Sequence, residues 1–225
     1  MSIVIITGGI IQDQAVKTYM EGRSVSHIIA VDGGVDKAEK LLLCPDYIVG
    51  DFDTLVPEKL EKYKNANDIK IQQFQPEKDD TDTQIAVELA IKLAGERKTP
   101  CENFQEDIII FGALGKRFDH ALANVLLLEK FASAGLCACI VDEYNRISVH
   151  RQSFSLEKSC QYGTYVSFLA LTPLVTGITL TGFKYPLTQH TLKQEDSLCI
   201  SNELVKETGT VSFLDGILLM VESRD

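Results

Sequence analysis

The sequence lacks any run of apolar residues long enough to cross a membrane as a helix. Its first residues, Met1–Gly9, contain no basic side chain and are too short for a signal peptide, so they are interpreted as a first β-strand. These absences predict a cytoplasmic protein whose cysteines are free thiols. Cys137 and Cys139 have no second pair at zinc-finger spacing, which favours buried strand thiols over a metal site.

Basic residues are also scarce. The chain has 22 Lys and Arg against 32 Asp and Glu, and its formal net charge is −10. Binding to a nucleic-acid backbone needs a broad basic surface, so this charge argues against a nucleic-acid partner. It does not exclude a nucleotide, because a divalent cation can join carboxylates and phosphates in one site.

Two common phosphate-binding motifs are missing. A P-loop requires Gly-x4-Gly-Lys-Ser/Thr, but Gly115 and Lys116 are followed by Arg117 and preceded at the required distance by Ile110. A dinucleotide fingerprint requires Gly-x-Gly-x-x-Gly after the first strand, where only Gly8-Gly9 occurs. The remaining scheme is a metal held by carboxylates, with separate basic residues around the phosphates.

The 225 residues have the apolar and charged content of an ordinary globular protein. Residues 1–142 alternate short apolar runs with segments of helical periodicity, which predicts a mostly parallel α/β sheet flanked by helices. The expected strands are Ile3–Thr7, His27–Val31, Tyr47–Val49, Ile69–Phe74, Ile108–Phe111 and Ala138–Val141. The expected helices are Asp13–Met20, Val35–Leu42, Pro57–Tyr63, Asp80–Ala94 and Asp119–Ala134.

Helical periodicity ends after Asp142, and short segments rich in β-branched and aromatic residues follow. Residues 143–225 are therefore predicted to form a second, all-β domain resembling a small sandwich. Its expected strands are Ile147–Arg151, Tyr165–Leu171, Gly177–Thr181, Leu198–Ser201, Thr210–Leu214 and Gly216–Val221. Asp215-Gly216 predicts a hairpin between the last two.

Polar segments follow the predicted parallel strands where each one ends. Two are acidic, Gly50–Thr54 and Lys78–Asp82, and three contain glycine, namely Gly8-Gly9, Asp32-Gly33-Gly34 and Gly112–His120. The carboxyl ends of parallel strands share one edge of the sheet, where ligands bind. The pattern predicts that Mg²⁺ is held by Asp51, Asp53 and Asp82, and a polyphosphate by Lys78, Lys116 and Arg117. The alternative is that Asp51 and Asp53 end a turn and cap a helix.

The segment Gly112–His120 has a similar ambiguity. Its glycines can expose backbone amides to an anion at the start of the following helix. Asp119 could serve the site or only cap that helix. His120 and Asn124 share a helix face, and His120 could donate a proton, contact a nucleotide or simply be solvated.

Taken in order, these motifs resemble those of the thiamine pyrophosphokinase family. The matching segments are Asp32-Gly33-Gly34, Gly50-Asp51-Phe52-Asp53-Thr54, Lys78-Asp79-Asp80-Thr81-Asp82 and Gly115-Lys116-Arg117-Phe118-Asp119-His120 with Asn124. In the tail, Gly182-Phe183-Lys184-Tyr185-Pro186-Leu187 and Ser201-Asn202-Glu203 are similar to motifs of that family's β-domain. Each motif is weak alone, but the ordered set is specific.

The resemblance implies transfer of the pyrophosphoryl group of ATP to the hydroxyl of thiamine, with Mg²⁺, giving thiamine diphosphate and AMP. It implies that 1–142 is the catalytic, ATP-binding domain and 143–225 a thiamine-binding and dimerisation domain of a homodimer. The implied catalytic residues are Asp51, Asp53, Asp82 and Arg117, and the implied ATP-binding residues are Asp32, Gly33, Gly34, Lys78, Thr81, Asp119, His120 and Asn124. Ser201 and Asn202 match residues that contact thiamine across the dimer interface.

Two departures from the family pattern concern single residues. Thr54 stands where Ser is usual, which keeps a hydroxyl. The chain has no Trp, whereas some members of the family stack a Trp on thiamine. Phe183 or Tyr185 could take this role. The alternative is that both are core residues of a strand in the β-domain.

Two rival functions remain at this stage. Asp51-Phe52-Asp53 is also a DxD metal motif, as in metal-dependent glycosyl- or nucleotidyltransferases. The other rival is a nucleotide-binding module without catalysis, in which the carboxylates are only structural.

Overall fold

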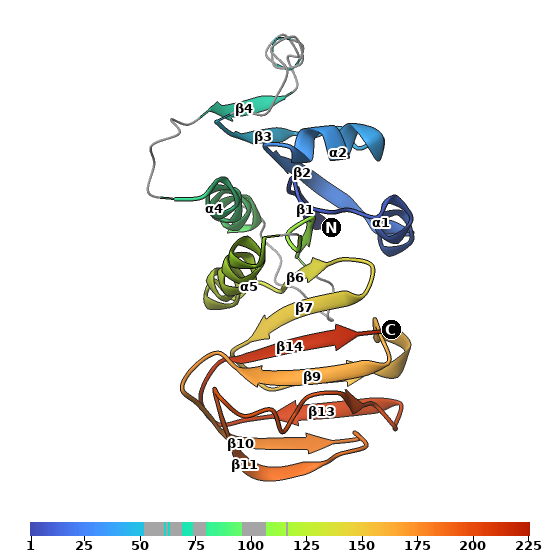
Figure 1. The fold of residues 1–225 in the computed structure, drawn as a ribbon, viewed down its shortest axis with the longest axis vertical. Coiled ribbons are helices and arrows are strands. Elements are labelled where there is room, and N and C mark those ends of the chain that lie inside the picture. The colour runs from blue at the N-terminus through green and yellow to red at the C-terminus, as the bar shows by residue number, and fades with distance from the viewer. Residues whose placement is uncertain (52–60, 62, 64–68, 74–79, 96–106, 116) are drawn as a thin grey trace. The chain divides into compact units, whose positions relative to one another are not determined.

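The computed structural model describes residues 1–51, 61, 63, 69–73, 80–95, 107–115 and 117–225. The chain divides into two compact units, Met1–Glu143 and Tyr144–Asp225 (Figure 1). In this described part of the chain, no helix has the length and apolar character needed to span a membrane. The predicted helix Pro57–Tyr63 lies almost wholly outside the described residues.

The first unit alternates strands and helices, as its periodicity predicts. Its strands are β1 (Ser2–Ile6), β2 (Val25–Val31), β3 (Tyr47–Gly50), β4 (Lys70–Gln73), β5 (Ile108–Phe111) and β6 (Ala138–Val141). Its helices are α1 (Asp13–Met20), α2 (Gly34–Lys40), α4 (Asp82–Gly95) and α5 (Phe118–Ser133). Most boundaries fall within two residues of the predicted ones.

These strands pair in parallel in the order β6-β5-β1-β2-β3-β4. The chain moves outward from β1 to β4 and then continues on the other side of β1 with β5 and β6. The direction of winding therefore reverses between β1 and β5. In open α/β sheets, ligands bind at such a reversal, outside the carboxyl ends of the strands.

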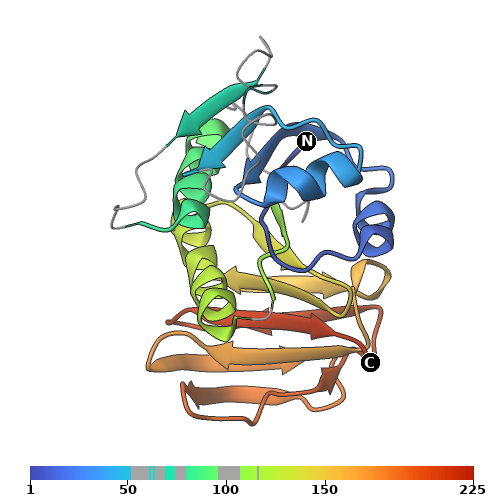
Figure 2. The same cartoon turned by 45° about the horizontal axis from the view of Figure 1, so that its top comes forward.

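Complete burial explains the apolar sequences of the central strands. Ile3–Ile6 and Ile108–Phe111 are essentially inaccessible to solvent, as expected for parallel strands covered on both faces. Helices α4 and α5 lie on one face, joined by an ion pair between Lys130 and Glu88 at 2.7 Å, and α1 and α2 lie on the other (Figure 1, Figure 2). This core holds the loops at the carboxyl edge of the sheet.

The second unit is built from antiparallel strands. They are β7 (Asn145–His150), β8 (Phe154–Glu157), β9 (Tyr165–Ala170), β10 (Leu174–Thr181), β11 (Leu187–Lys193), β12 (Asn202–Glu203), β13 (Thr208–Ser212) and β14 (Leu218–Ser223), with a 3-10 turn at Lys158–Cys160. Pairing gives one set in the order β12-β9-β14-β7 and another in the order β11-β10-β13-β8. One buried core includes Phe168 and Met220 of the first set and Leu180 and Val211 of the second. The predicted sandwich-like architecture is confirmed.

The predicted hairpin at Asp215-Gly216 is wrong. Strand β13 pairs with β8 and β10, whereas β14 pairs with β7 and β9. Asp215 instead bridges to Thr176, and Gly216 has φ 109°, where a Cβ would lie 2.6 Å from the carbonyl oxygen of Leu174. The dipeptide does mark a sharp change of direction, but it carries the chain between two sheets.

The predicted strand Leu198–Ser201 is also wrong, because this segment is a tight turn. The amide of Ile200 donates to the carbonyl of Ser197 at 3.2 Å, and Ser201 has φ 57°. Only Cys199 of the segment is buried. Strands β8, β11 and β12 were not predicted, because β11 is mostly polar and exposed and β12 has two residues.

Candidate active site at the carboxyl edge of the parallel sheet

Asp32 and Asp51 follow neighbouring strands, β2 and β3. Asp32 adopts φ 45°, and its amide donates to the carbonyl of Val49 at 3.0 Å. This conformation lays the Asp32 carboxylate over the Cα of Gly50, where any Cβ would overlap Oδ1. Glycine is therefore required at position 50, and it brings the Asp32 carboxylate beside the residue that precedes Asp51.

Glycines bring the other loops of this edge into backbone contact. A Cβ on Gly8 would lie 3.4 Å from the Cα of Gly33, and a Cβ on Gly9 would overlap the carbonyl of Gly112. A Cβ on Gly34 would overlap the carbonyl of Ile6. The loops after β1, β2 and β5 thus form a surface with few side chains, where a ligand can approach the backbone.

Asp82 is the first residue of α4, which packs against β1, β2 and β3. A helix that returns from a parallel strand starts at the carboxyl edge, so Asp82 lies at the same edge as Asp32 and Asp51. The hydroxyl of Thr81 accepts a hydrogen bond from the amide of Gln84 at 3.2 Å. Thr81 therefore caps α4, which begins two residues after the predicted start at Asp80.

Arg117 and Asp119 form a two-point ion pair at the start of α5. The distances are 2.6 Å from Nη2 to Oδ2 and 3.2 Å from Nε to Oδ1. The hydrogen bond from Arg117 is the main cause that lowers the pKa of Asp119 to about 2. Arg117, not Asp119, occupies the N-cap position, so the interpretation of Asp119 as the cap is wrong. Both side chains are exposed, so the Arg117 guanidinium is accessible to solvent and ligands.

Asn124 has a definite structural contact. Its Nδ2 donates to the carbonyl of Ala113 at 2.8 Å, which ties the loop after β5 to α5. His120, one turn earlier, is exposed. Asn124 therefore supports the loop that contains Gly112 and Gly115.

Some predicted site residues lie outside the described residues, namely Asp53, Thr54, Lys78 and Lys116. Within the described part of the chain, no group of three or more His, Cys, Asp or Glu side chains could hold a metal. Mg²⁺ needs only one or two protein carboxylates when substrate phosphates and water complete its shell. The hard oxygen donors of Asp32 and Asp51 suit that ion.

The predicted thiamine-binding residues lie on the second unit. Asn202 is 2% exposed, and its Oδ1 accepts from the amides of Tyr185 at 3.0 Å and Glu203 at 2.9 Å. Its Nδ2 donates to the carbonyl of Tyr185 at 2.8 Å. Ser201 is exposed, and its amide donates to the Ser167 hydroxyl at 2.9 Å. Asn202 thus holds the backbone at Tyr185.

The two aromatic candidates differ in position. Phe183 is buried and packs edge to face on Phe168, with ring centroids 5.6 Å apart. Tyr185 is 58% exposed, with the Lys184 ammonium 5.7 Å from its ring centroid. The core interpretation therefore holds for Phe183 and is wrong for Tyr185.

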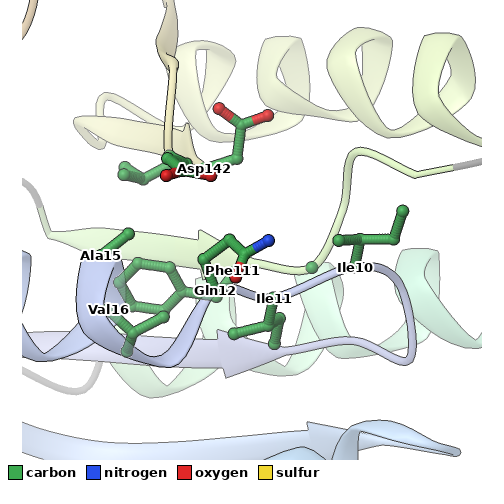
Figure 3. Close-up of a pocket in the computed structure, with 10 residues that line it drawn as sticks. Ile10, Ile11, Gln12, Ala15, Val16, Phe111 and Asp142 are labelled. Atoms are coloured by element: carbon green, nitrogen blue, oxygen red, sulfur yellow. The ribbon is translucent and has the colours of Figure 1, made fainter.

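A cavity beside Gly112 was not predicted. It is lined by the loop after β1, the first turn of α1 and the ends of β5 and β6 (Figure 3). The apolar pair Ile10-Ile11 directly after Gly8-Gly9 was an available signal, because a buried strand has already ended there.

Fold and site together define a nucleotide-binding type of α/β protein with a C-terminal β unit. Carboxylates and an arginine lie along the carboxyl edge of a parallel sheet whose winding reverses between β1 and β5, which suits a phosphorylated ligand with a divalent cation. A fold alone does not specify a reaction, so comparison with known proteins decides between the candidates.

Residues 20–140 match the family described as "Thiamin pyrophosphokinase, catalytic domain", and residues 151–218 match "Thiamin pyrophosphokinase, vitamin B1 binding domain". The thiamine pyrophosphokinase of Bacillus subtilis (strain 168) is 35% identical over 198 residues, which cover 85% of this chain and 86% of that protein. The chain therefore belongs to the thiamin pyrophosphokinase family, as its motifs predict, and it is an enzyme of that activity.

Solved structures agree with this assignment. The crystal structure of thiamine pyrophosphokinase from Bacillus subtilis matches with a TM-score of 0.83 at 31% identity, covering 100% of both chains. The enzyme from Geobacillus thermodenitrificans matches with a TM-score of 0.80 at 35% identity, covering 100% of this chain and 98% of the other. The predicted α/β fold followed by a β unit is confirmed, and neither rival function is supported.

Proposed function

We propose that residues 1–142 bind Mg²⁺ and ATP at the carboxyl edge of the sheet, and that residues 143–225 bind thiamine and mediate dimerisation. The pyrophosphoryl group of ATP is transferred to the thiamine hydroxyl, which gives thiamine diphosphate and AMP. The observation that carries this proposal is the Asp32 carboxylate lying over Gly50, directly beside Asp51. A side chain at position 50 would overlap the Asp32 carboxylate, so this arrangement depends on the glycine.

Asp51, Asp53 and Asp82 hold the Mg²⁺ in this proposal. When bound, the ion neutralises charge that develops on the transferred phosphoryl oxygens and on the leaving oxygen. Asp32 and the backbone of Gly33 and Gly34 also contact the bound ATP in this proposal. The chain's carboxylates therefore act mainly by holding the Mg²⁺ and orienting the phosphates, and less by accepting a proton. A primary alcohol needs little deprotonation in a loose transition state.

The basic residues of the proposal orient the phosphates. The Arg117 guanidinium already makes a two-point contact with the Asp119 carboxylate, and phosphate offers it the same geometry. Asp119 keeps the guanidinium extended at the start of α5 until ATP binds. Lys78, Lys116, Thr81, His120 and Asn124 complete the proposed ATP-binding set.

Ser201 and Asn202 contribute to thiamine binding in different ways. The exposed hydroxyl of Ser201 is available for direct contact with the ligand. Both lone pairs of Asn202 Oδ1 and one of its N–H groups already bind backbone. Asn202 therefore acts mainly by fixing Tyr185, whose exposed ring replaces the tryptophan of other members. In the proposed homodimer, these residues face ATP bound to the partner subunit.

The test is incubation of the purified chain with ATP, thiamine and Mg²⁺. AMP and thiamine diphosphate should form together and in equal amounts, because one pyrophosphoryl group leaves ATP for each thiamine modified. Chelation with EDTA should abolish turnover, and added Mg²⁺ should restore it. Folded protein that forms neither product would refute the proposal, and full turnover in EDTA would refute the metal.

A further inference from the structure

A cation already lies beside the residues proposed to bind thiamine. The Lys184 ammonium is 2.6 Å from Oε1 of Glu203 and 5.7 Å from the ring centroid of Tyr185. A carboxylate and the face of an aromatic ring both attract positive charge at such distances. The hydrogen bond to Glu203 is the main cause that raises the pKa of Lys184, so the ammonium stays charged at neutral pH. Lys184 therefore marks a position where this surface holds a cation.

Backbone contacts fix the residues around this cation. The amide of Lys184 donates to the carbonyl of Glu203 at 2.8 Å. The buried Asn202 side chain binds the backbone of both Tyr185 and Glu203. Tyr165 stands opposite Glu203 in the pairing of β9 with β12, which places a second tyrosine beside the same carboxylate. The backbone positions of Tyr185 and Glu203 are therefore set independently of the Lys184 side chain.

The ion pair between Lys184 and Glu203 can be broken at small cost. The Lys184 side chain is 46% exposed and the Glu203 side chain 33% exposed, so water reaches both charges. Exposed ion pairs contribute little to stability, because water competes for each partner and two flexible side chains must be ordered. The long lysine side chain can therefore move into solvent when another cation takes its place.

Thiamine is a cation of the kind that this position fits. Its thiazolium ring is flat, aromatic and permanently charged, so it can stack on a tyrosine while its charge faces a carboxylate. Ser201, which is exposed and is proposed to contact thiamine, lies two residues before Glu203 in the chain. The cation position and the proposed thiamine contact are thus neighbours on the same unit.

We propose that Glu203 recognises the positive charge of the thiazolium ring and that Lys184 occupies this position until thiamine displaces it. In the free chain, Lys184 neutralises the Glu203 carboxylate beside Tyr185. On binding, the thiazolium ring takes both partners and the ammonium moves into solvent. This proposal rests on the proposed function and deepens it, because it names the residues that select a cationic substrate.

The first test removes the charge of Glu203. Titration with thiamine is carried out with AMP present, since AMP cannot donate a pyrophosphoryl group and binding is measured apart from turnover. Glu203→Gln keeps the size of the side chain and should weaken thiamine binding about tenfold. It should change by less than twofold the binding of the analogue in which an uncharged thiophene replaces the thiazolium ring. In turnover, it should raise the KM for thiamine about tenfold and leave kcat at saturation unchanged.

The second test removes the competing cation. Lys184→Met keeps most of the side-chain length but frees the Glu203 carboxylate, so thiamine should bind about threefold more tightly. In the double variant with Glu203→Gln, this gain should disappear, because the two substitutions act on one interaction.

Glu157→Gln is the matched control, because Glu157 is also an exposed carboxylate on a strand of the same unit. Its oxygens accept from the Thr208 hydroxyl at 3.2 and 3.1 Å, with no part in the Lys184 pair. The substitution should leave the affinities for thiamine and for the uncharged analogue unchanged. Thermal unfolding of each variant confirms that it is folded.

Three results would overturn the proposal. One is equal weakening of thiamine and its uncharged analogue by Glu203→Gln, and another is no weakening of either. The third is that Lys184→Met gives no gain in thiamine affinity, which would show that Lys184 does not compete with the substrate. Wild-type chain that binds thiamine with these charge effects but forms no thiamine diphosphate would refute the proposed reaction and leave the cation site standing.

Discussion

Gly50 illustrates how one residue controls the arrangement of a site. The Asp32 carboxylate occupies the space where a side chain at position 50 would begin. Asp32 itself adopts φ 45°, a conformation that Asp tolerates better than most residues. The contact between Asp32 and Gly50 therefore depends on a glycine at position 50 and on a residue at position 32 that accepts a positive φ.

Removing the charge of a metal-holding carboxylate tests the site at this scale. Asp51→Asn and Asp82→Asn should each lower kcat by about a hundredfold or more, because the metal loses a charged ligand. Steady-state kinetics at several Mg²⁺ concentrations measure the effect. Glu88→Gln is the control, since Glu88 is an exposed carboxylate on the same helix as Asp82. Near-normal rates in both Asp variants would contradict the proposed metal site.

Leu42 offers a stability test away from the site. It follows the C-terminal end of α2 with φ 59° and is 88% exposed, so it has strain without burial. Leu42→Gly should raise the free energy of unfolding by about 0.5–1 kcal/mol, because glycine adopts this conformation without steric cost. Denaturant unfolding measures the change. Leu42→Ala keeps the Cβ and should give little or no gain; an equal gain would contradict the explanation.

At the scale of elements, the loops do more than connect strands. Asn124 ties the loop after β5 to α5, and Asn202 ties the segment at Tyr185 to β12. Both side chains act on backbone groups far away in sequence. A residue that the sequence predicts to bind a ligand can thus instead hold the backbone of a loop that binds it.

Asn202→Ala tests this division of roles. Loss of the three hydrogen bonds should loosen the Tyr185 segment and raise the KM for thiamine about tenfold, with kcat changed less than threefold at saturating ATP. Asn202→Asp keeps the acceptor oxygen but loses the N–H donor. Its KM for thiamine should lie between those of the wild-type chain and Asn202→Ala. A loss confined to kcat would indicate a catalytic role for Asn202 instead.

At the scale of the whole molecule, stability should depend on pH through His150. Burial is the main cause that lowers the pKa of His150 to about 4, and Arg146 adds to it. The unfolded chain takes up this proton near pH 6.5, whereas the folded chain does not until about pH 4. The free energy of unfolding should therefore fall by about 1–2 kcal/mol as the pH is lowered from 6.5 to 5.

His150→Phe provides the comparison, because a phenyl ring preserves the stacking on Phe154, whose centroid lies 3.8 Å from that of His150. Its stability should depend less on pH between 6.5 and 5 than that of the wild-type chain. Denaturant unfolding at several pH values measures both. Parallel pH profiles would show that His150 is not the responsible group.

Shared active sites would be visible in mixed dimers. If ATP and thiamine are bound by different subunits, a dimer of one Asp82→Asn and one Asn202→Ala chain contains one intact site. An equal mixture should then reach about a quarter of the wild-type rate at subsaturating thiamine, after subunit exchange. Exchange is verified with differently tagged chains. Failure to exceed the unmixed variants would place each site within one subunit.

The sequence by itself determined the parts of this protein that depend on local pattern. Apolar runs bounded by Gly or Asp, such as Ile108–Phe111, were sufficient to predict the parallel strands, since an uninterrupted apolar run reflects burial on both faces. The motif at Gly50–Thr54, taken with the other segments in order, was sufficient for the family. Both signals are contained in short stretches of chain.

Only the tertiary structure decided which distant elements meet. Asp215-Gly216 predicts a hairpin, but β13 pairs with β10 and β14 pairs with β9, so the two strands lie in different sets. Tyr185 and Phe183 are both aromatic residues between β10 and β11, yet only Phe183 is in the core, because it pairs in an isolated bridge with Leu204 whereas Tyr185 is 58% exposed. The cavity beside Gly112 likewise needs β5 and β6 beside α1, a contact that no local pattern encodes.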